Sequence, residues 1–373
     1  MDSVLAIGLM SGTSRDGIDA ALIETDGDLH IRPLCFLTFP YTEPVRELLA
    51  KASLIAQNMA LPGPEGLIDE AEGVINSLHL DAIKRLLNYG GFDREEIEVI
   101  GFHGHTVAHK PELGWSWQLG KGGIIADEAR IPVMTEFRQS DLAEGGQGAP
   151  LMPVFHRALT DDLAKPLAIL NLGGVANITA IYSDGDMCAF DTGMANALID
   201  DWMLAETGAP LDEDGQAAAR GSVDEDIVTE MIAHRYFRAA PPKSLDRDEF
   251  SARSVKGLSV DDGAATLTAF SAEGVARGLY QLAQRPDHLY VSGGGRKNAT
   301  LMRMIAARSG VSVTPIEKLG WNGDAIEAQG MAYLAARRHA LLPASFPGTT
   351  GVAKPTLCGT LYRPSERRSA DRL

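Results

Sequence analysis

Three stretches rich in glycine and in small polar residues are the places where this chain offers exposed backbone for binding an anion. They read MSGTSRDG, NLGGVANIT and VSGGGRKNAT, and each follows an apolar run typical of a β-strand. Glycine turns after strands expose N–H groups, which is how proteins bind nucleotide phosphates. One such turn is more often purely conformational, but three in one chain favour a nucleotide site built from several hairpins. None matches GxxxxGK[ST] or the spacing of GxGxxG, so neither a P-loop nor a Rossmann site is predicted.

Carboxylates and histidines supply the other candidate chemistry. Asp191 stands in FDTG, at the expected end of a strand next to a helix, where it could serve as a general base or cap the helix. His103 and His105 in HGH fall on one face of a strand, a spacing that metal-dependent hydrolases use. No HExxH or HxxEH pattern accompanies them, and two histidines alone favour a structural role.

The segments that must position these residues alternate between strand-like and helix-like patterns, which predicts an α/β fold. Strands are expected at residues 3–9, 18–25, 97–104, 166–182 (a pair around its glycine turn) and 186–193, and helices at residues 45–57, 70–91, 124–131 and 194–208. The last helix is expected to bury a face made of Met194, Leu198, Trp202 and Ala205.

Size and charge narrow the class of protein. The chain has 373 residues, and a prior of about 150 residues per domain suggests two domains and therefore a cleft. A net charge of −16 without a basic cluster argues against a nucleic-acid partner.

No apolar run is long enough for a membrane span and the start, MDSVLAIG, does not resemble a signal peptide, so we expect a cytoplasmic protein with no membrane partner. Cys35, Cys188 and Cys358 lack CxxC spacing, which predicts neither disulfides nor structural zinc.

The chain resembles the anhydro-N-acetylmuramic acid kinase family almost from end to end. The segments that carry the resemblance, in order, are GLMSGTSRDGID, FHGHTVAHKPE, FRQSDLAEGGQGAPLMPVFH, LNLGGVANIT, FDTGMANALIDDW, DEDG, PPKSLDRDEF, SGGGRKNATLM and IEAQGMAYLAAR. The resemblance implies the actin-like fold of sugar kinases and Hsp70 ATPases, with two domains that each contain a ribonuclease-H-like mixed sheet and close around ATP and a sugar. We place the N-terminal domain at residues 1–138 plus 346–373 and the C-terminal domain at residues 139–345.

The family's reaction implies a function and cofactors. Water opens the 1,6-anhydro bridge of a cell-wall sugar while ATP phosphorylates the released O6, giving N-acetylmuramic acid 6-phosphate and ADP for recycling. ATP and Mg²⁺ are the implied cofactors, with the metal ligands left open, and a homodimer is the implied assembly. Three alternatives stay open: a kinase of another 1,6-anhydrosugar such as levoglucosan, a metal-dependent hydrolase that uses His103 and His105, and a nucleotide sensor without catalysis.

Matches to the family segments imply the site residues. Asp191 matches the general base that takes a proton from the attacking water. The residues that match nucleotide-binding and phosphate-binding segments are Gly12, Thr13, Ser14, Asp16, Gly17, Asp19, Gly173, Gly174, Asn177, Gly293, Gly294, Gly295 and Asn298. Those that match the sugar site are His103, Arg138, Asp141 and Glu327. Asp16 and Asp19 face Mg²⁺ or the sugar, or simply form the turn, and Arg138 is suited to pair the lactyl carboxylate bidentately.

Five positions depart from the family pattern. Met194 and Ala195 replace the usual Pro and Gly after DTG, which removes a preset first helical turn and a point of close backbone approach. His105 stands in place of Gln, Arg15 in place of an apolar residue, and Lys121 in place of Asp or Asn. These departures concern the fit of the sugar more than the type of reaction.

Overall fold

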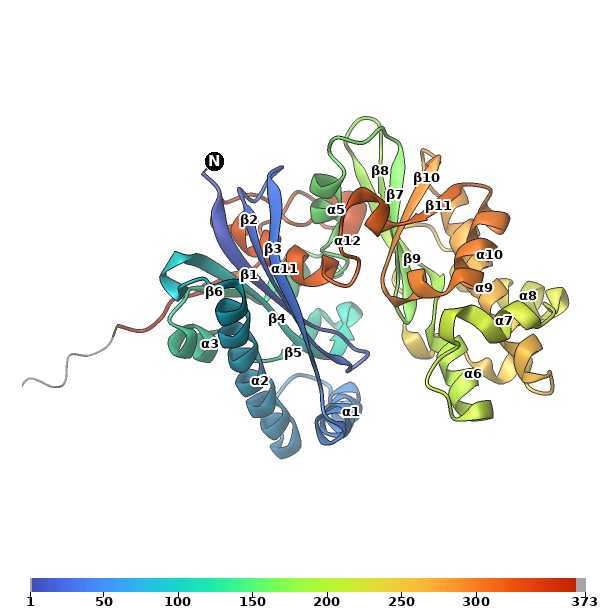
Figure 1. Cartoon of the computed structure of the whole chain (residues 1–373), viewed down its shortest axis with the longest axis horizontal. Coiled ribbons are helices and arrows are strands. Elements are labelled where there is room, and N and C mark those ends of the chain that lie inside the picture. The colour runs from blue at the N-terminus through green and yellow to red at the C-terminus, as the bar shows by residue number, and fades with distance from the viewer. Residues whose placement is uncertain (1, 367–373) are drawn as a thin grey trace, which may run out of the picture. The chain divides into compact units, whose positions relative to one another are not determined.

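The computed structural model describes residues 2–366. The chain forms two compact units, of which unit 1 consists of Met1–Asp161 and Glu327–Leu373, and unit 2 of Asp162–Ile326 (Figure 1). These boundaries differ from the expected ones at 138/139 and 345/346. Residues 139–161 and 327–345 belong with the N-terminal strands instead of with the second domain.

Unit 1 is built on a seven-stranded mixed sheet. Its strands are β1 (Val4–Ser11), β2 (Gly17–Thr25), β3 (Ile31–Pro40), β4 (Ile97–Lys110), β5 (Trp115–Leu119), β6 (Val133–Thr135) and β12 (Thr360–Tyr362). The order across the sheet is β12-β6-β4-β1-β2-β3, with β5 paired to β4. The first three strands form an antiparallel meander, whereas β1, β4 and β6 run parallel to one another.

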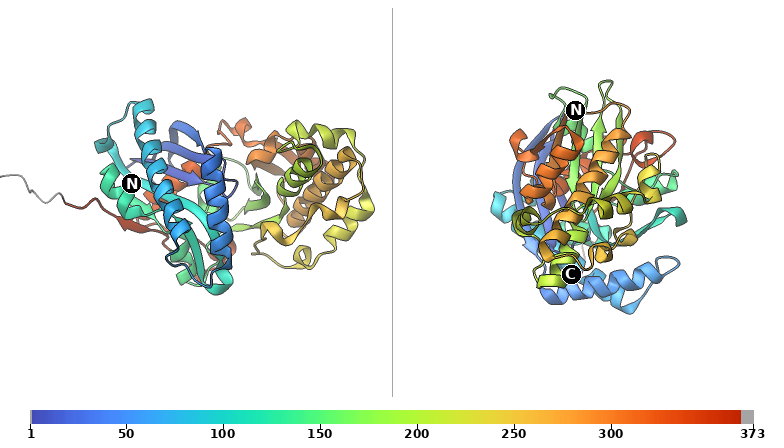
Figure 2. Two further views of the ribbon diagram at one scale, coloured as in Figure 1. Left: turned by 90° about the horizontal axis from the view of Figure 1, so that it is seen from below. Right: turned by 90° about the vertical axis from the view of Figure 1, so that its right-hand side faces the viewer.

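The helices of unit 1 have clear sequence signals at their ends. They are α1 (Glu43–Asn58), α2 (Gly66–Gly90), α3 (Gly122–Ala129), α4 (Phe137–Ala143), α5 (Pro153–Leu159), α11 (Ile326–His339) and α12 (Pro347–Thr350). The carboxylate of Glu65 caps α2 by accepting hydrogen bonds from the N–H groups of Leu67 and Ile68, both at 3.0 Å. Gly91 ends α2 in the left-handed conformation, as its glycines predicted. Figure 2 shows α1 and α2 lying side by side.

Helix α11 packs directly on the centre of this sheet. A Cβ atom at Gly8 of β1 would lie 1.8 Å from the carbonyl oxygen of Ala328, and one at Gly101 of β4 would lie 2.0 Å from that of Met331. Only glycine permits so close an approach of helix and strands. Because α11 shares its core with β1 and β4, it belongs to unit 1, which explains why the second boundary falls before it.

Unit 2 repeats the strand order of unit 1 on a five-stranded sheet. Its strands are β7 (Leu167–Leu172), β8 (Val175–Ile181), β9 (Met187–Met194), β10 (His288–Ser292) and β11 (Ser312–Pro315). β7, β8 and β9 form an antiparallel meander, while β7, β10 and β11 run parallel. Both units therefore contain three antiparallel strands followed by two strands parallel to the first. This is the ribonuclease-H-like arrangement, and it confirms the expected α/β, actin-like fold.

The helices of unit 2 gather on one side of its strands (Figure 1). They are α6 (Ala197–Thr207), α7 (Gln216–Arg220), α8 (Glu225–Ile232), α9 (Val260–Tyr280) and α10 (Ala299–Ser309). Helix α9 is buried along most of its length and packs against β9, so that Phe190 and Val275 share one core. Small residues make this burial possible, because a Cβ at Gly263 would meet the indole ring of Trp202 at 2.4 Å.

The expected helix over residues 194–208 is shorter in the structure. Met194 is the last residue of β9, and α6 begins at Ala197. Leu198 and Trp202 are buried as expected, but Ala205 is exposed. The apolar pattern therefore located the buried face of the helix but placed its start too early. Met194 pairs with β8 and remains part of strand β9.

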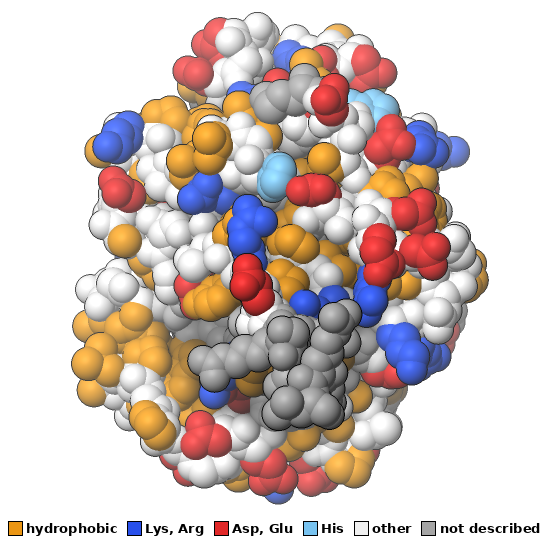
Figure 3. Space-filling model, turned by 90° about the vertical axis from the view of Figure 1, so that its left-hand side faces the viewer, with side chains coloured by type: hydrophobic (Ala, Val, Ile, Leu, Met, Phe, Trp, Pro, Cys, Tyr) orange, Lys and Arg blue, Asp and Glu red, His pale blue; other side chains and the backbone are white. Residues whose placement is uncertain are grey.

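Charged groups are mixed on the surface. On the face in Figure 3, Lys and Arg side chains are interspersed with Asp and Glu. An anionic substrate therefore needs individual basic residues at its site. No helix among residues 2–366 is long and apolar enough to cross a membrane.

Candidate active site

The first glycine-rich stretch forms the tip of the hairpin that joins β1 to β2. The N–H of Arg15, a residue in the left-handed conformation with φ of 57°, donates to the carbonyl of Gly12 at 3.1 Å and closes the turn. The hydroxyl of Ser14 donates to Oδ1 of Asp16 at 2.8 Å. Thr13 and Ser14 are exposed. The N–H groups of both residues and the hydroxyl of Thr13 therefore suit the binding of an anion at this tip.

Two other expected phosphate-site residues contact the neighbouring strand β3. Gly17 is buried, and a Cβ there would lie 2.4 Å from the carbonyl oxygen of Phe39 on β3. Asp19 on β2 accepts a hydrogen bond from the hydroxyl of Thr38 at 2.6 Å. Gly17 is thus explained by strand packing, whereas Asp19 is partly exposed.

Glu327 joins these acids to the expected sugar-binding arginine in one electrostatic cluster of unit 1. Burial raises the pKa of Glu327 above its usual value, and the negative charges of Asp19 and Asp16 raise it further. The guanidinium of Arg138 acts in the opposite direction. The start of α11, the β1–β2 hairpin and α4 therefore bring these four residues close enough to influence one another.

His103 on β4 is hydrogen-bonded to Arg138 on α4. Nε of Arg138 donates to Nε2 of His103 at 3.2 Å, and Nδ1 of His103 lies 3.0 Å from the carbonyl oxygen of Gly104. Because Nε2 accepts, the hydrogen-bond pattern assigns the proton to Nδ1 of a neutral ring. Burial, followed by the charge of Arg138, lowers the pKa of His103 to about 3. Arg138 also donates to the carbonyl of Gly148 at 3.2 Å.

Asp141 differs from its expected role as a residue lining the sugar. It is fully buried, and its Oδ2 accepts a hydrogen bond from the N–H of Gly148 at 2.6 Å. Its Oδ1 accepts from the hydroxyl of Thr350 at 2.6 Å. Asp141 therefore holds the loop whose Gly148 carbonyl in turn binds Arg138. As a buried residue, it supports the predicted sugar site indirectly, through the loop that contacts Arg138.

His105 belongs to a separate hydrogen-bond network under the hairpin. Its Nδ1 lies 2.8 Å from Oγ of Ser11, which lies 2.7 Å from the hydroxyl of Tyr41. Burial is the main reason that the pKa of His105 is lowered to about 4. Over the described part of the chain, no group of three or more His, Cys, Asp or Glu side chains is placed to hold a metal ion. His103 and His105 therefore take part in different contacts, and the geometry does not favour them as a pair of metal ligands.

A row of polar residues crosses the sheet of unit 2. Ser292 is paired with Asn171, Asn171 with Asn177, and Asn177 with Asp191, on β10, β7, β8 and β9 respectively. Residues that pair directly across strands share a face of the sheet, and the alternate face, which includes Phe190, is the apolar core. The sequence pointed to Asn177 and Asp191 but missed Asn171, because only the strand register brings it into this row.

The second and third glycine-rich stretches meet around Asn196. Its Nδ2 donates to the carbonyl oxygens of Leu172 at 3.0 Å and Gly173 at 2.8 Å. A Cβ at Gly295 would lie 2.6 Å from Cβ of Leu172 and 2.9 Å from Oδ1 of Asn196. The two turns follow β7 and β10, which are parallel, so both lie at the same edge of the sheet. Gly294 is exposed there.

Gly174 and Asn298 shape these turns. The carbonyl of Gly174 accepts hydrogen bonds from the N–H groups of Ala195 at 2.9 Å and Ala197 at 3.2 Å, which ties the tip to the start of α6. Oδ1 of Asn298 accepts from the N–H of Leu301 at 2.9 Å and caps α10. Asn298 is buried, so its side chain acts through the helix cap. Gly293 has φ of 76°, a conformation that favours glycine.

Asp191 lies within β9 and does not cap a helix. The strand continues to Met194, and α6 begins at Ala197 after Asn196. This position argues against the capping role that the sequence left open. Asp191 is partly exposed and lies at the end of the row of polar residues that crosses the sheet.

A distant segment surrounds Asp191 with hydrogen bonds. The N–H of Asp191 donates to the carbonyl of Lys243 at 2.9 Å, and the N–H of Leu245 donates to Oδ2 of Asp191 at 2.8 Å. The hydroxyl of Tyr236 donates to the carbonyl of Asp191. Sequence reasoning missed these three partners. Lys243 and Leu245 stand in the family-like segment PPKSLDRDEF and Tyr236 precedes it, and only the fold brings them to Asp191.

Lys243 places a positive charge beside this carboxylate. Its Nζ donates to the carbonyl of Tyr236 at 3.0 Å and lies 4.6 Å from the centre of the Tyr236 ring and 5.8 Å from that of Phe190. Burial lowers the pKa of Lys243 to about 8, while the attraction of Asp191 opposes that change. Burial, and then the charge of Asp191, raises the pKa of Tyr236. At neutral pH, Lys243 is therefore charged and Tyr236 is a neutral phenol.

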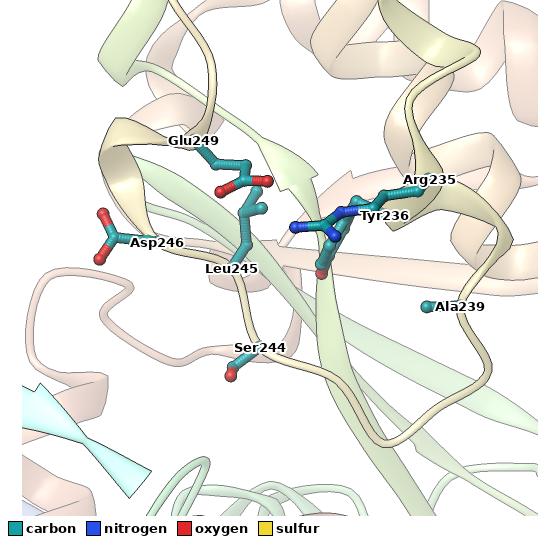
Figure 4. Close-up of a pocket in the computed structure, with 7 residues that line it drawn as sticks. All are labelled: Arg235, Tyr236, Ala239, Ser244, Leu245, Asp246 and Glu249. Atoms are coloured by element: carbon teal, nitrogen blue, oxygen red, sulfur yellow. The ribbon is translucent and has the colours of Figure 1, made fainter. Parts of the chain in front are cut away.

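A cavity of about 470 Å³ adjoins the same segment (Figure 4). It is lined by Arg235, Tyr236, Ala239, Ser244, Leu245, Asp246 and Glu249. Figure 4 shows Arg235 and Tyr236 on one side of it, with Leu245 and Glu249 on the other. Two of the residues that hydrogen-bond Asp191, Tyr236 and Leu245, thus form part of the cavity wall.

Comparison with known proteins shows the family to which the chain belongs. The family model of anhydro-N-acetylmuramic acid kinase matches residues 4–364. The anhydro-N-acetylmuramic acid kinase of Rhizorhabdus wittichii is 52% identical over 98% of this chain and 100% of its own length. That of Zymomonas mobilis is 48% identical over 96% of this chain and 100% of its own length. These matches define a kinase, that is, a phosphotransferase. The chain belongs to the anhydro-N-acetylmuramic acid kinase family.

One solved structure with a similar fold is component A of (R)-2-hydroxyglutaryl-CoA dehydratase from Acidaminococcus fermentans. It has a TM-score of 0.48 and 12% sequence identity, and the match covers 90% of this chain and 99% of the other. The description of the fold given above rests on the strand order of this chain itself.

Proposed function

We propose that this protein is an ATP-dependent kinase that opens 1,6-anhydro-N-acetylmuramic acid by hydrolysis and phosphorylates O6. The products are N-acetylmuramic acid 6-phosphate and ADP, which serve cell-wall sugar recycling. The observation that carries the proposal is the carboxylate of Asp191 on β9, which accepts a hydrogen bond from the N–H of Leu245 and interacts electrostatically with Lys243. Family membership supports the choice of sugar.

Asp191 acts as the general base in this reaction. The water oxygen attacks C1 of the sugar and gives its proton to Asp191, and the C1–O6 bond breaks with its electrons going to O6. O6 then bonds to the γ-phosphorus, whose bond to the bridging oxygen breaks to release ADP. Neutral water attacks an acetal slowly, and a positioned carboxylate contributes roughly 10²-fold to 10⁴-fold to such a step.

The nucleotide is assigned to the three glycine turns. The exposed tip at Thr13 and Ser14 and the turn at Gly173 bind phosphates, and residues 293–295 contact the adenosine. Backbone donors suit this role because they need no reorganisation as charge shifts during transfer. Asp16 and Asp19 are the carboxylates suited to Mg²⁺, which keeps several waters and takes few protein ligands. The ion would neutralise phosphate charge.

The sugar is assigned to Arg138, Glu327 and His103. The planar guanidinium of Arg138 can pair the lactyl carboxylate bidentately, which supplies the local positive charge that a chain of net charge −16 otherwise lacks. His103 and the loop at Gly148 support Arg138 from behind. Asp141 contributes by holding that loop.

A coupled ADP-release assay with Mg-ATP tests the proposal. The wild type and Asp191→Asn are compared on 1,6-anhydro-N-acetylmuramic acid, anhydroglucose and ordinary N-acetylmuramic acid. Asp162→Asn, an exposed aspartate of the same unit, is the matched control. We expect release with the anhydro-muramoyl sugar only and its loss in Asp191→Asn alone. Release with anhydroglucose instead would assign a levoglucosan-type substrate, and no sugar-dependent release would refute the kinase.

Two further expectations concern the assembly and the location of the protein. We expect a homodimer that works in the cytoplasm. A monomeric mass by light scattering at working concentration would exclude the dimer, and cell fractionation tests the location. Tightly bound stoichiometric zinc with turnover independent of ATP would instead support the metal-dependent hydrolase.

A further inference from the structure

The segment from Lys243 to Leu245, which has no regular secondary structure, lies beside Asp191 of β9. It accepts a hydrogen bond from the backbone of Asp191 through the Lys243 carbonyl, at 2.9 Å, and donates one to the Asp191 carboxylate through the Leu245 N–H, at 2.8 Å. The hydroxyl of Tyr236, which precedes this segment in the sequence, donates a hydrogen bond to the Asp191 carbonyl. One region therefore constrains both the backbone and the side chain of the proposed base.

We propose that residues 243–245, together with Tyr236, form a clamp that positions the carboxylate of Asp191 and keeps it ionised. The inference rests on the proposed function, in which Asp191 accepts a proton. Leu245 is a positioning residue, because its backbone N–H contacts Asp191 and its side chain packs elsewhere, against the apolar cluster of unit 2. Lys243 acts through its charge.

Two physical effects make the clamp matter for the reaction. A hydrogen bond to the ionised carboxylate favours that form, as does a nearby positive charge, and only the ionised form can take a proton from water. A fixed carboxylate also reaches the water in the right direction, and a displacement of about 1 Å can cost roughly 100-fold in rate.

Lys243 and Tyr236 are two titratable groups that respond to the charge of Asp191. Tyr236 is neutral at working pH and contributes as a hydrogen-bond donor. Asn177, which pairs with Asp191 across β8 and β9, carries no charge. Lys243 thus supplies a positive charge that can keep Asp191 ionised.

Substitutions at Leu245 isolate the backbone hydrogen bond. Leu245→Pro removes the N–H, whereas Leu245→Ala keeps it and shortens the side chain to a similar extent. In the ADP-release assay, we expect Leu245→Pro to lower kcat/KM by about 10-fold to 100-fold and to move the acid limb of its pH profile upward by about one unit. The acid limb of Leu245→Ala is expected to stay at the wild-type pH.

Substitutions at Lys243 isolate the charge. Lys243→Met removes it while keeping a flexible apolar side chain, and we expect the acid limb to move upward. Lys243→Arg restores a permanent positive charge and is expected to return the acid limb towards the wild-type position. Combining Lys243→Met with Asp191→Asn should add no further loss, because the group on which Lys243 acts is then absent.

A measurement that needs no substrate keeps the inference separate from the proposed function. The carboxyl ¹³C signal of Asp191, assigned by its absence in Asp191→Asn, is titrated by NMR in the wild type, Leu245→Pro and Lys243→Met. A midpoint raised by about one unit in both variants supports the clamp. Unchanged midpoints in folded variants would overturn it. Inactivity of the wild type on every anhydrosugar would refute only the proposed function.

Discussion

The N–H of Leu245 donates a 2.8 Å hydrogen bond to Oδ2 of Asp191, although 54 positions separate the two residues in the sequence. The carboxylate comes from a strand of the unit 2 sheet, and its donor comes from a segment without regular structure. The proposed base therefore depends on a contact that neither local pattern contains. The contact can therefore be tested by substitutions at Asp191 or at the residues of the distant segment.

Removal of the Tyr236 hydroxyl should weaken the clamp without destroying it. Tyr236→Phe keeps the ring that packs beside Phe237 and deletes the hydrogen bond to the Asp191 carbonyl. We expect unfolding to become easier by about 1 kcal/mol and kcat to fall several-fold. Urea denaturation and steady-state kinetics measure the two effects. An unchanged kcat would mean that the hydroxyl serves folding alone.

The charge of Lys243 should affect the acid limb of activity and leave the alkaline side unchanged. Burial lowers the pKa of Lys243 to about 8, so its positive charge is present throughout the acid limb and disappears only above that pH. We expect kcat/KM of the wild type and of Lys243→Arg to depend on pH in the same way between pH 7 and pH 9, because a carboxylate base needs the neighbouring charge only where it would otherwise be protonated. A basic limb near pH 8 that moves to higher pH in Lys243→Arg would show that Lys243 acts on a group other than Asp191.

Acid should destabilise the fold through buried histidines such as His105. The usual pKa of 6.5 falls to about 4 in the folded protein, so the unfolded chain binds more protons between these values. The stability that the neutral ring provides is complete above about pH 6.5 and is lost as the pH falls towards 4. Its magnitude is about 3 kcal/mol for this residue.

His105→Gln tests this expectation because glutamine does not titrate and can still hydrogen-bond Ser11. Thermal melting between pH 7 and pH 4 should show a smaller loss of stability in the variant than in the wild type. Other histidines with lowered pKa values remain in both proteins and contribute to the residual loss: His79 and His109, lowered to about 4, and His103 and His156, lowered to about 3. Parallel curves would show that His105 is not protonated on unfolding.

The glycine turn after β10 offers a matched pair of substitutions. A Cβ at Gly295 would lie 2.6 Å from Leu172 and press on Asn196, whereas one at Gly294 meets no atom within 4 Å. We expect Gly295→Ala to cost about 1–3 kcal/mol of stability and Gly294→Ala to leave stability unchanged. A raised KM for ATP in Gly294→Ala, at normal stability, would support adenosine contact. Equal stability of both variants would contradict the tight packing.

Arg138 should discriminate between sugars with and without the lactyl group. We expect Arg138→Lys to lower kcat/KM about 10-fold to 100-fold on 1,6-anhydro-N-acetylmuramic acid, because lysine cannot form a bidentate pair. On 1,6-anhydro-N-acetylglucosamine, which lacks the carboxylate, the loss should be only a few-fold. Equal losses on both sugars would show that Arg138 acts by supporting His103, to which it is hydrogen-bonded.

Local patterns predicted much of this fold. Apolar runs located β1, β2 and β7 to β9, and glycines located the turns between them, because both signals depend on residues close in sequence. The first turn of α6 was predicted wrongly, since pairing with β8 keeps Met194 in a strand. The domain boundary also differed, because Gly8 and Gly101 draw α11 onto the N-terminal sheet across more than 200 residues.

The sequence by itself determined the family, the reaction class and the identity of the proposed base, because short ordered motifs preserve chemistry that needs particular side chains. Only the tertiary structure decided what surrounds those side chains. It buried Asp141 beneath a loop and aligned Asn171 with Asp191 across three strands. It also brought Lys243 and Leu245 to the carboxylate. Strand register and long-range packing fix such neighbours, and their energy is shared among residues far apart in the chain, so no local pattern contains it.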